Sequence, residues 1–129
     1  MTVRKLAVCL SVALAMVVGF GIGPASAANG SKDLYVAGIL KATAYHTDST
    51  DTMCVRALNS QTGARATAEI VDASLQVPLD YVSDGGGDNE QHCTSTPGYA
   101  IDGIAVYLYV CFISAAGKST CDSSPVFAG

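Results

Sequence analysis

The side chains in this chain with the clearest capacity for acid–base or metal chemistry are two histidines. His46 opens the turn-like segment HTDSTD, and His92 directly precedes Cys93 in a long polar stretch. Histidine transfers protons or binds metal only when partner side chains lie close to it in space. Neither histidine sits in a sequence motif that would bring such partners together. We therefore expect both histidines to be exposed in loops, and we predict no catalytic residue.

Sequence motifs of the common enzyme classes are absent. The chain has no Gly-x-Ser-x-Gly elbow, no His-Glu-x-x-His motif, no phosphate-binding glycine loop and no dinucleotide-binding fingerprint. A Ser-His-Asp triad forms in space and not in sequence, so a small secreted hydrolase stays an open alternative. We predict a non-enzymatic protein without a cofactor. A secreted inhibitor of a protease or glycosidase is a further alternative, because stapled loops lose little entropy on binding.

The glycine-rich segment 84–90 carries four oxygen-bearing side chains. Calcium takes about six to eight oxygen ligands, so such a loop is a weak candidate for a calcium site. The spacing matches neither an EF-hand loop nor the glycine-rich nonapeptide repeat. We expect a solvated acidic loop and no bound metal. The candidate calcium ligands are Asp84, Asp88, Asn89 and Glu90.

Tyrosines provide the candidate binding surface. Tyr107 and Tyr109 share one side of a strongly alternating segment, and Tyr35 and Tyr45 share one side of another. Tyrosines on a sheet face can bind protein or sugar, although strands also favour tyrosine for packing alone. We expect the partner to be an extracellular protein or a component of the cell wall.

A targeting segment precedes the elements that position these residues. Residues 1–27 combine two early basic residues, an apolar run through residue 22 and the tripeptide Ala-Ser-Ala at 25–27. These are the three parts of a secretory signal peptide. The run is shorter than the roughly 20 residues of a membrane span and ends in Gly-Pro, so we predict cleavage after Ala27 and not a permanent anchor. The mature chain is then a secreted, extracellular domain of residues 28–129.

The mature chain is acidic. It keeps five of the seven basic residues and all eleven acidic residues, which gives a net charge of −6. An acidic surface repels phosphate groups, so we predict no nucleic-acid partner and no membrane association after cleavage of the signal.

Four cysteines remain in the mature chain, and an even number in a short exported protein predicts two disulfides. Residues 114–118 match a three-residue hairpin loop with Gly117 where positive φ is needed. Counting three residues outward from each end of this loop places Cys111 opposite Cys121. No close Cys-x-x-Cys pair is present, which argues against a zinc site. The predicted disulfides are Cys54–Cys93 and Cys111–Cys121.

Period-two alternation of apolar side chains predicts strands through most of the mature chain. Residues 28–33 are expected to be a mobile terminus and residues 83–103 a long loop. Pro78 cannot donate to a strand ladder, so its strand belongs at a sheet edge. We predict an all-β fold, a small antiparallel β-sandwich of immunoglobulin-like or similar type, with a small barrel as the alternative. The expected strands are 35–45, 52–58, 64–71, 75–81, 104–112, 118–121 and 125–127.

The chain resembles the small secreted proteins of actinobacteria. The resemblance rests on the signal peptide, the composition rich in Ala, Gly and Val, and the segment VCFISAAGKSTC near the C-terminus. It implies an exported protein and carries no site residue. The tail SSPVFA is similar to that of secreted subtilisin inhibitors, but the cysteine spacing differs from that family's pattern and no reactive-site segment follows a Cys-Pro.

Overall fold

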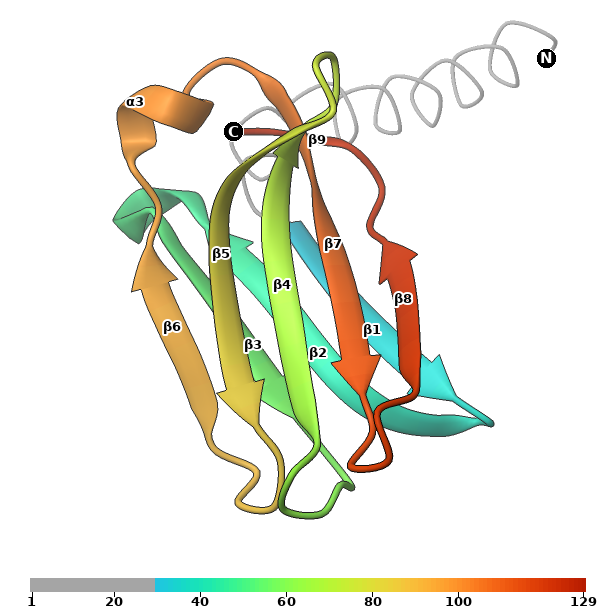
Figure 1. Cartoon of the computed structure of the whole chain (residues 1–129). Coiled ribbons are helices and arrows are strands. Elements are labelled where there is room, and N and C mark those ends of the chain that lie inside the picture. The colour runs from blue at the N-terminus through green and yellow to red at the C-terminus, as the bar shows by residue number, and fades with distance from the viewer. Residues whose placement is uncertain (1–29) are drawn as a thin grey trace, which may run out of the picture.

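Two antiparallel sheets packed face to face make up the protein (Figure 1). The computed structural model describes residues 30–129, without the side chain of Tyr99. The predicted signal peptide and its cleavage site lie outside these residues. Within the described range, no helix has the length and apolar character needed to cross a membrane. The prediction of an all-β sandwich is confirmed.

The first sheet has the strand order β1-β2-β3-β6, and the second has the order β5-β4-β7-β8 with β9 paired to β7. One 3-10 turn, η1 (Asp48–Thr50), and one turn of helix, α3 (Gly98–Ile101), connect strands at one end of the sandwich. The edge position predicted for the strand with Pro78 is confirmed, since β5 ends the second sheet. The strands of the first sheet are β1 (Gly30–Val36), β2 (Ile39–Thr47), β3 (Thr52–Ala57) and β6 (Gln91–Ser95). Those of the second are β4 (Arg65–Asp72), β5 (Val77–Gly85), β7 (Ala105–Ile113), β8 (Ser119–Ser123) and β9 (Phe127–Ala128).

The core lies between the sheets and follows from the alternation along each strand. Alternate residues of β7 point inward and are fully buried, while Tyr107 and Tyr109 between them face outward. Strands β2 and β4 contribute alanines, whose small side chains let the two sheets approach closely. Larger side chains from β3, β4 and β7 fill the remaining space. The fully buried set includes Ala42, Ala66, Ala68, Met53, Ile70, Val106, Leu108 and Val110.

Both predicted disulfides are confirmed. Cys111 and Cys121 are directly opposed on β7 and β8, and the backbone N–H of Ser114 donates to the carbonyl of Lys118 at 2.9 Å, as the hairpin count requires. Cys54 and Cys93 are opposed on β3 and β6. The loops they close span 39 and 10 residues, for which chain entropy gives about 4 and about 3 kcal/mol.

The N-terminal expectation was wrong. Residues 30–36, expected to be partly a mobile terminus, form β1, and the single strand expected over 35–45 is two strands joined by a tight turn. Ala37 and Gly38 both have positive φ, 52° and 80°, as in a type I′ turn. Alanine is unusual at the first of these positions, which is why the sequence hides the turn.

The long loop expected over 83–103 was also wrong. Strand β5 continues to Gly85, and β6 and α3 occupy half of the remainder. Strand β6 has the sequence QHCTS and a mostly exposed surface, so it carries no apolar alternation that would predict a strand. Its place in the first sheet depends on pairing with β3 and on the disulfide to Cys54.

Candidate functional site

The four candidate tyrosines do not form one surface. Tyr107 and Tyr109 lie on the outer face of the second sheet. Tyr35 and Tyr45 lie on strands of the first sheet, where the residues flanking each of them turn toward the core. The two pairs therefore face away from each other across the sandwich.

The second sheet has a further exposed tyrosine that the sequence did not single out. Tyr81 of β5 and Tyr109 of β7 are both directly opposite Glu69 of β4, so one row across the sheet reads tyrosine, glutamate, tyrosine. Neighbouring strands lie about 4.8 Å apart, which puts the backbones of the two tyrosines about 10 Å from each other with that of Glu69 between them. The tyrosines are 50% and 38% exposed. We call Tyr81, Glu69, Tyr107 and Tyr109 the tyrosine face.

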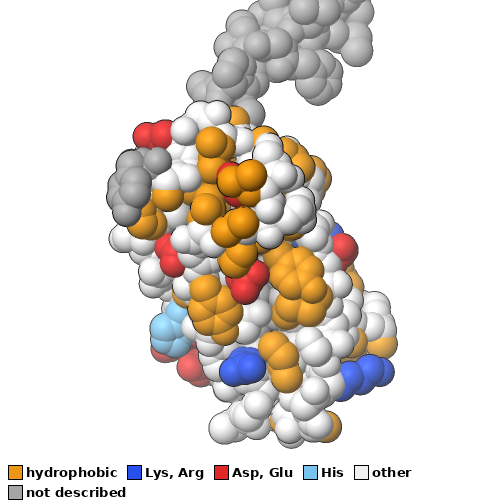
Figure 2. Space-filling view, turned by 45° about the horizontal axis from the view of Figure 1, so that its top comes forward, with side chains coloured by type: hydrophobic (Ala, Val, Ile, Leu, Met, Phe, Trp, Pro, Cys, Tyr) orange, Lys and Arg blue, Asp and Glu red, His pale blue; other side chains and the backbone are white. Residues whose placement is uncertain are grey.

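A hydrogen bond to the β4–β5 hairpin holds the third tyrosine of this face, Tyr107. Tyr107 Oη donates to Gln76 Oε1 at 2.8 Å, which ties its ring to the β4–β5 hairpin. Figure 2 shows hydrophobic side chains gathered over this side of the molecule, with acidic and basic side chains among them. The surface is thus aromatic and interrupted by charge.

A β-bulge explains why Tyr81 was missed. Alternation places Tyr81 on the same side as Leu79, but Ile70 pairs with Asp80 while Val71 pairs with Pro78. Leu79 is the extra residue, so the side-chain phase of β5 changes there. Leu79 consequently packs against the core, and Tyr81 faces solvent.

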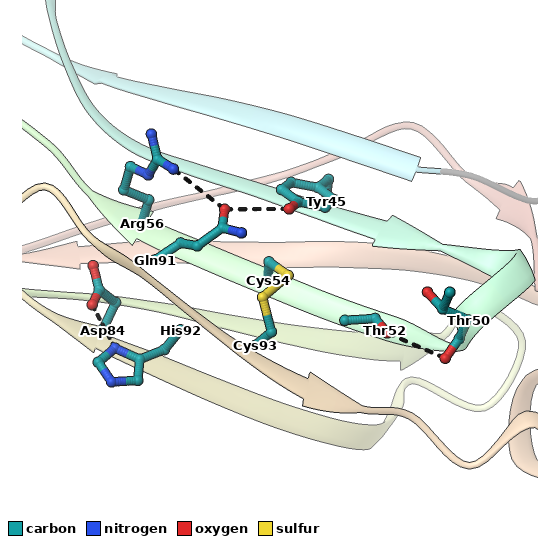
Figure 3. The surroundings of a disulfide bond; sticks show 9 residues. All are labelled: Tyr45, Thr50, Thr52, Cys54, Arg56, Asp84, Gln91, His92 and Cys93. Carbon is teal, nitrogen blue, oxygen red and sulfur yellow. Dashed lines mark hydrogen bonds and ion pairs between the residues drawn. A yellow bond between two sulfur atoms is a disulfide. The ribbon is translucent and has the colours of Figure 1, made fainter.

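On the opposite sheet, Tyr45 belongs to a structural contact network. It lies in one row with the Cys54–Cys93 disulfide, and its Oη donates to Gln91 Oε1 at 3.2 Å. Arg56 Nη2 donates to the same Gln91 oxygen at 3.4 Å (Figure 3). These contacts hold β6 against β2 and β3.

His92 forms a pair with a buried carboxylate. Its Nδ1 lies 2.6 Å from Oδ1 of Asp84, whose other oxygen accepts the backbone N–H of Ala57 at 2.8 Å. The hydrogen bond that His92 makes to Asp84 is the largest effect and raises the pKa of His92. Loss of solvent contact lowers this pKa by less, and the charges of Asp84, Asp88 and Glu90 add smaller increases. Figure 3 shows the imidazole beside Asp84.

The pair joins the two sheets at one open edge. His92 lies on β6, the edge of the first sheet, and Asp84 on β5, the edge of the second. The expectation that His92 occupies a loop was wrong, although its side chain is exposed as expected. Among the described side chains, Asp84 is the one that the structure shows bonded to His92.

His46 contradicts the expectation of an exposed loop residue. It is 1% exposed and lies on β2, on the same inward face as Ala42 and Ala44. Its ring centroid is 6.0 Å from that of Phe127, and neither ring nitrogen has a hydrogen-bond partner among residues 30–129. Its position is that of a core side chain.

The four residues of the calcium candidate are separated by the fold. Asp84 is fully buried and directs both oxygens to protein partners. Asp88, Asn89 and Glu90 are exposed, and Asp88 Oδ1 accepts the backbone N–H of Glu90 at 3.0 Å. This arrangement does not gather them around one ion.

A different acidic cluster lies at the end of the sandwich near α3. Carboxylate oxygens of Asp48, Asp51 and Asp102 lie within 4.8 Å of one another. Exposed acidic groups of this kind are common without a bound ion. No further donor in the described chain is shown to complete a coordination shell, so we assign no metal to this cluster.

A cavity of about 530 Å³ lies at the opposite end of the sandwich, and no sequence pattern predicted it. Its residues are separated in sequence and come together through the pairing of β4 with β7 and the packing of the first sheet, with β2, against them. They are Val36, Lys41, Asn59, Ser60, Gln61, Ala64, Phe112, Ser114 and Ala115.

Comparison of the chain with protein-family models, with curated proteins and with solved structures finds no match.

Proposed function

We propose that this protein is a secreted, non-enzymatic module that binds a neutral glycan of the cell wall or medium on its tyrosine face. The observation that supports this most strongly is the row of Tyr81, Glu69 and Tyr109 across the second sheet. Both rings are exposed in a folded chain that could have buried them, and two rigid strands fix their spacing.

The chemistry of this row suits a sugar chain. Aromatic rings stack against the C–H faces of pyranose rings and contribute apolar area at low entropic cost, because tyrosine has few rotatable bonds. The Glu69 carboxylate between them can accept hydrogen bonds from sugar hydroxyls. The net charge of −6 on residues 28–129 disfavours anionic polymers, which leaves neutral glycans as the best fit.

The two disulfides support the proposal that the protein is secreted. Structural disulfides persist in oxidising compartments and are rare in the cytosol. Cys54–Cys93 and Cys111–Cys121 both cross-link neighbouring strands, so they belong to the fold itself. An exported binding module is consistent with this chemistry.

Affinity electrophoresis tests the proposal. The purified mature protein is run through native gels that contain soluble glucan, xylan, mannan or glycol chitin, and one of these is expected to retard it. Replacing Tyr81 and Tyr109 with Ala should abolish the retardation, because both stacking surfaces are removed. Tyr35→Ala is the matched control, since Tyr35 is 57% exposed on the other sheet.

Two outcomes would contradict the proposal. One is unchanged mobility of the wild-type protein in every gel. The other is equal retardation of the wild-type protein and the double variant.

One observation favours a second candidate, a small secreted hydrolase. The contact between Asp84 and His92 resembles the way a carboxylate orients a histidine for general-base chemistry. Turnover of ester, amide or glycoside substrates by the wild-type protein but not by His92→Ala would favour this candidate over the binding module. Neither Asp84 nor His92 lines the cavity, which counts against the hydrolase.

A further inference from the structure

The cavity at the end of the sandwich is a second place where a ligand could bind, and it is separate from the tyrosine face. Its volume of about 530 Å³ lies within the range of small-molecule sites. Phe112 and Ala64 give it apolar lining, while Lys41 and Ser114 bring polar groups from the first and second sheets.

The walls of the cavity are fixed by hydrogen bonds. Asn59 Nδ2 donates to the carbonyl of Leu40 at 3.0 Å, and the backbone N–H of Gly86 donates to the carbonyl of Ala64 at 2.8 Å. Gly86 also packs closely behind the loop, because a Cβ there would lie 2.6 Å from Ser60 Oγ. A ligand would therefore enter a preformed site and would have little protein to order.

Lys41 is the only charged side chain among the residues that line the cavity. Its ammonium group donates to the backbone carbonyl of Asn59 and lies 5.6 Å from the centroid of the Phe112 ring. An ammonium carries three N–H donors, and within residues 30–129 only this one hydrogen bond uses them. In a molecule that is acidic overall, the cavity is a local positive site.

We propose that this cavity binds a small organic monocarboxylate. The carboxylate accepts charge-assisted hydrogen bonds from Lys41 Nζ, and the hydrocarbon part of the ligand packs against Phe112 and Ala64. Ser60 also lines the cavity, but its Oγ is buried beside Gly86, so Lys41 supplies the hydrogen bonds to the carboxylate. The same chemistry is offered by a free short-chain fatty acid and by the C-terminus of a peptide.

The test compares acids with their own amides. Butyrate and N-acetyl-L-alanine, with butyramide and N-acetyl-L-alaninamide as uncharged partners, are titrated into ¹⁵N-labelled mature protein. Saturable shifts are expected at the amides of Asn59, Ser60 and Ser114, with each acid binding about tenfold or more tightly than its amide. Tighter binding of butyrate indicates a fatty acid as the ligand, and tighter binding of N-acetyl-L-alanine indicates the C-terminus of a peptide.

Three variants sharpen the result. Lys41→Met keeps the apolar stem of the side chain and should remove the preference for acid over amide. Lys118→Met is the control, because it removes an exposed lysine outside the cavity, and it should leave that preference intact. Ala115→Trp fills the cavity from an exposed turn and should block both acids without touching Lys41. Equal binding of acids and amides, acid binding unchanged in Lys41→Met, or shifts that never saturate would overturn the proposal.

Discussion

At the scale of single residues, Asp84 is the most constrained polar side chain that the structure shows. It is fully buried, and its two oxygens accept from the backbone of β3 and contact the imidazole of His92. One side chain therefore connects β5 to both β3 and β6. A buried carboxylate is tolerated here because both of its oxygens have partners.

Replacing Asp84 with Ala should destabilise the fold by about 1–3 kcal/mol, because the N–H of Ala57 is then left buried without an acceptor. Urea unfolding at neutral pH measures the loss. Asp33→Ala is the control and should cost much less, since Asp33 is an exposed acidic residue of β1. A loss below about 0.5 kcal/mol for Asp84→Ala, the range of ordinary surface substitutions, would contradict this role.

The same pair makes stability depend on pH. Asp84 raises the pKa of His92 above its ordinary value of 6.5. The proton is therefore held more tightly in the folded state. The contribution of the pair is fully present below pH 6.5 and is lost as the pH rises through the raised pKa.

The difference in stability between the wild-type protein and His92→Gln should accordingly be larger at about pH 5.5 than at about pH 9. Urea midpoints at the two pH values measure it, and an NMR titration of His92 gives the pKa directly. A His92 pKa at or below 6.5 would show that Asp84 does not act in this way.

At the scale of elements, cysteine spacing and hairpin geometry predicted more than hydrophobic pattern did. Counting outward from the loop at 114–118 gave the correct partner for Cys111, because register in a hairpin follows from the turn. The alternation of apolar side chains gave wrong predictions where the structure departs from regular amphipathic strands. The bulge at Leu79 reversed the side on which Tyr81 lies, and the polar strand β6 is held in place by contacts distant in sequence.

The buried histidine was predictable in hindsight from the same alternation. Ala42 and Ala44 point inward, and the period of two continues to His46. The polar residues that follow His46 suggested a turn two residues too early, since β2 continues to Thr47. The site was harder to foresee, because Glu69 and Tyr109 meet only when β4 pairs with β7.

The β1–β2 turn offers a stabilising substitution. Ala37 has φ of 52°, a conformation that costs an alanine free energy and that asparagine tolerates better. Ala37→Asn creates an Asn-Gly turn and should stabilise the fold by about 0.5–1 kcal/mol. Gly38→Ala, at φ of 80°, should have the opposite effect. Thermal unfolding distinguishes the two, and equal or reversed shifts would show that the turn is not of this type.

Strand β6 depends on its disulfide. Removing Cys54 and Cys93 together, as alanines, should cost about 4 kcal/mol and loosen β6 from β3. The His92 pKa should then move back toward its ordinary value, because the contact with Asp84 is made from β6. A variant with unchanged unfolding midpoint and unchanged His92 titration would show that β6 holds its place without the bridge.

At the scale of the whole molecule, each open edge of the sandwich is crossed by one charged pair. His92 meets Asp84 at the β6–β5 edge, and Lys32 Nζ lies 2.8 Å from Asp122 Oδ2 at the β1–β8 edge. Charged side chains at edge strands discourage edge-to-edge association with other chains. Glycan binding is therefore expected on a sheet face and not at an edge, and we propose the aromatic face of the second sheet for it.

The most direct measurement of this assignment is an NMR titration of the labelled mature protein with cellohexaose, xylohexaose, mannohexaose and chitohexaose. We predict that one of these shifts the ring and amide signals of Tyr81, Glu69 and Tyr109, while those of Tyr35 and Tyr45 on the other sheet stay in place. Shifts confined to the first sheet, or none with any of the four sugars, would contradict the account.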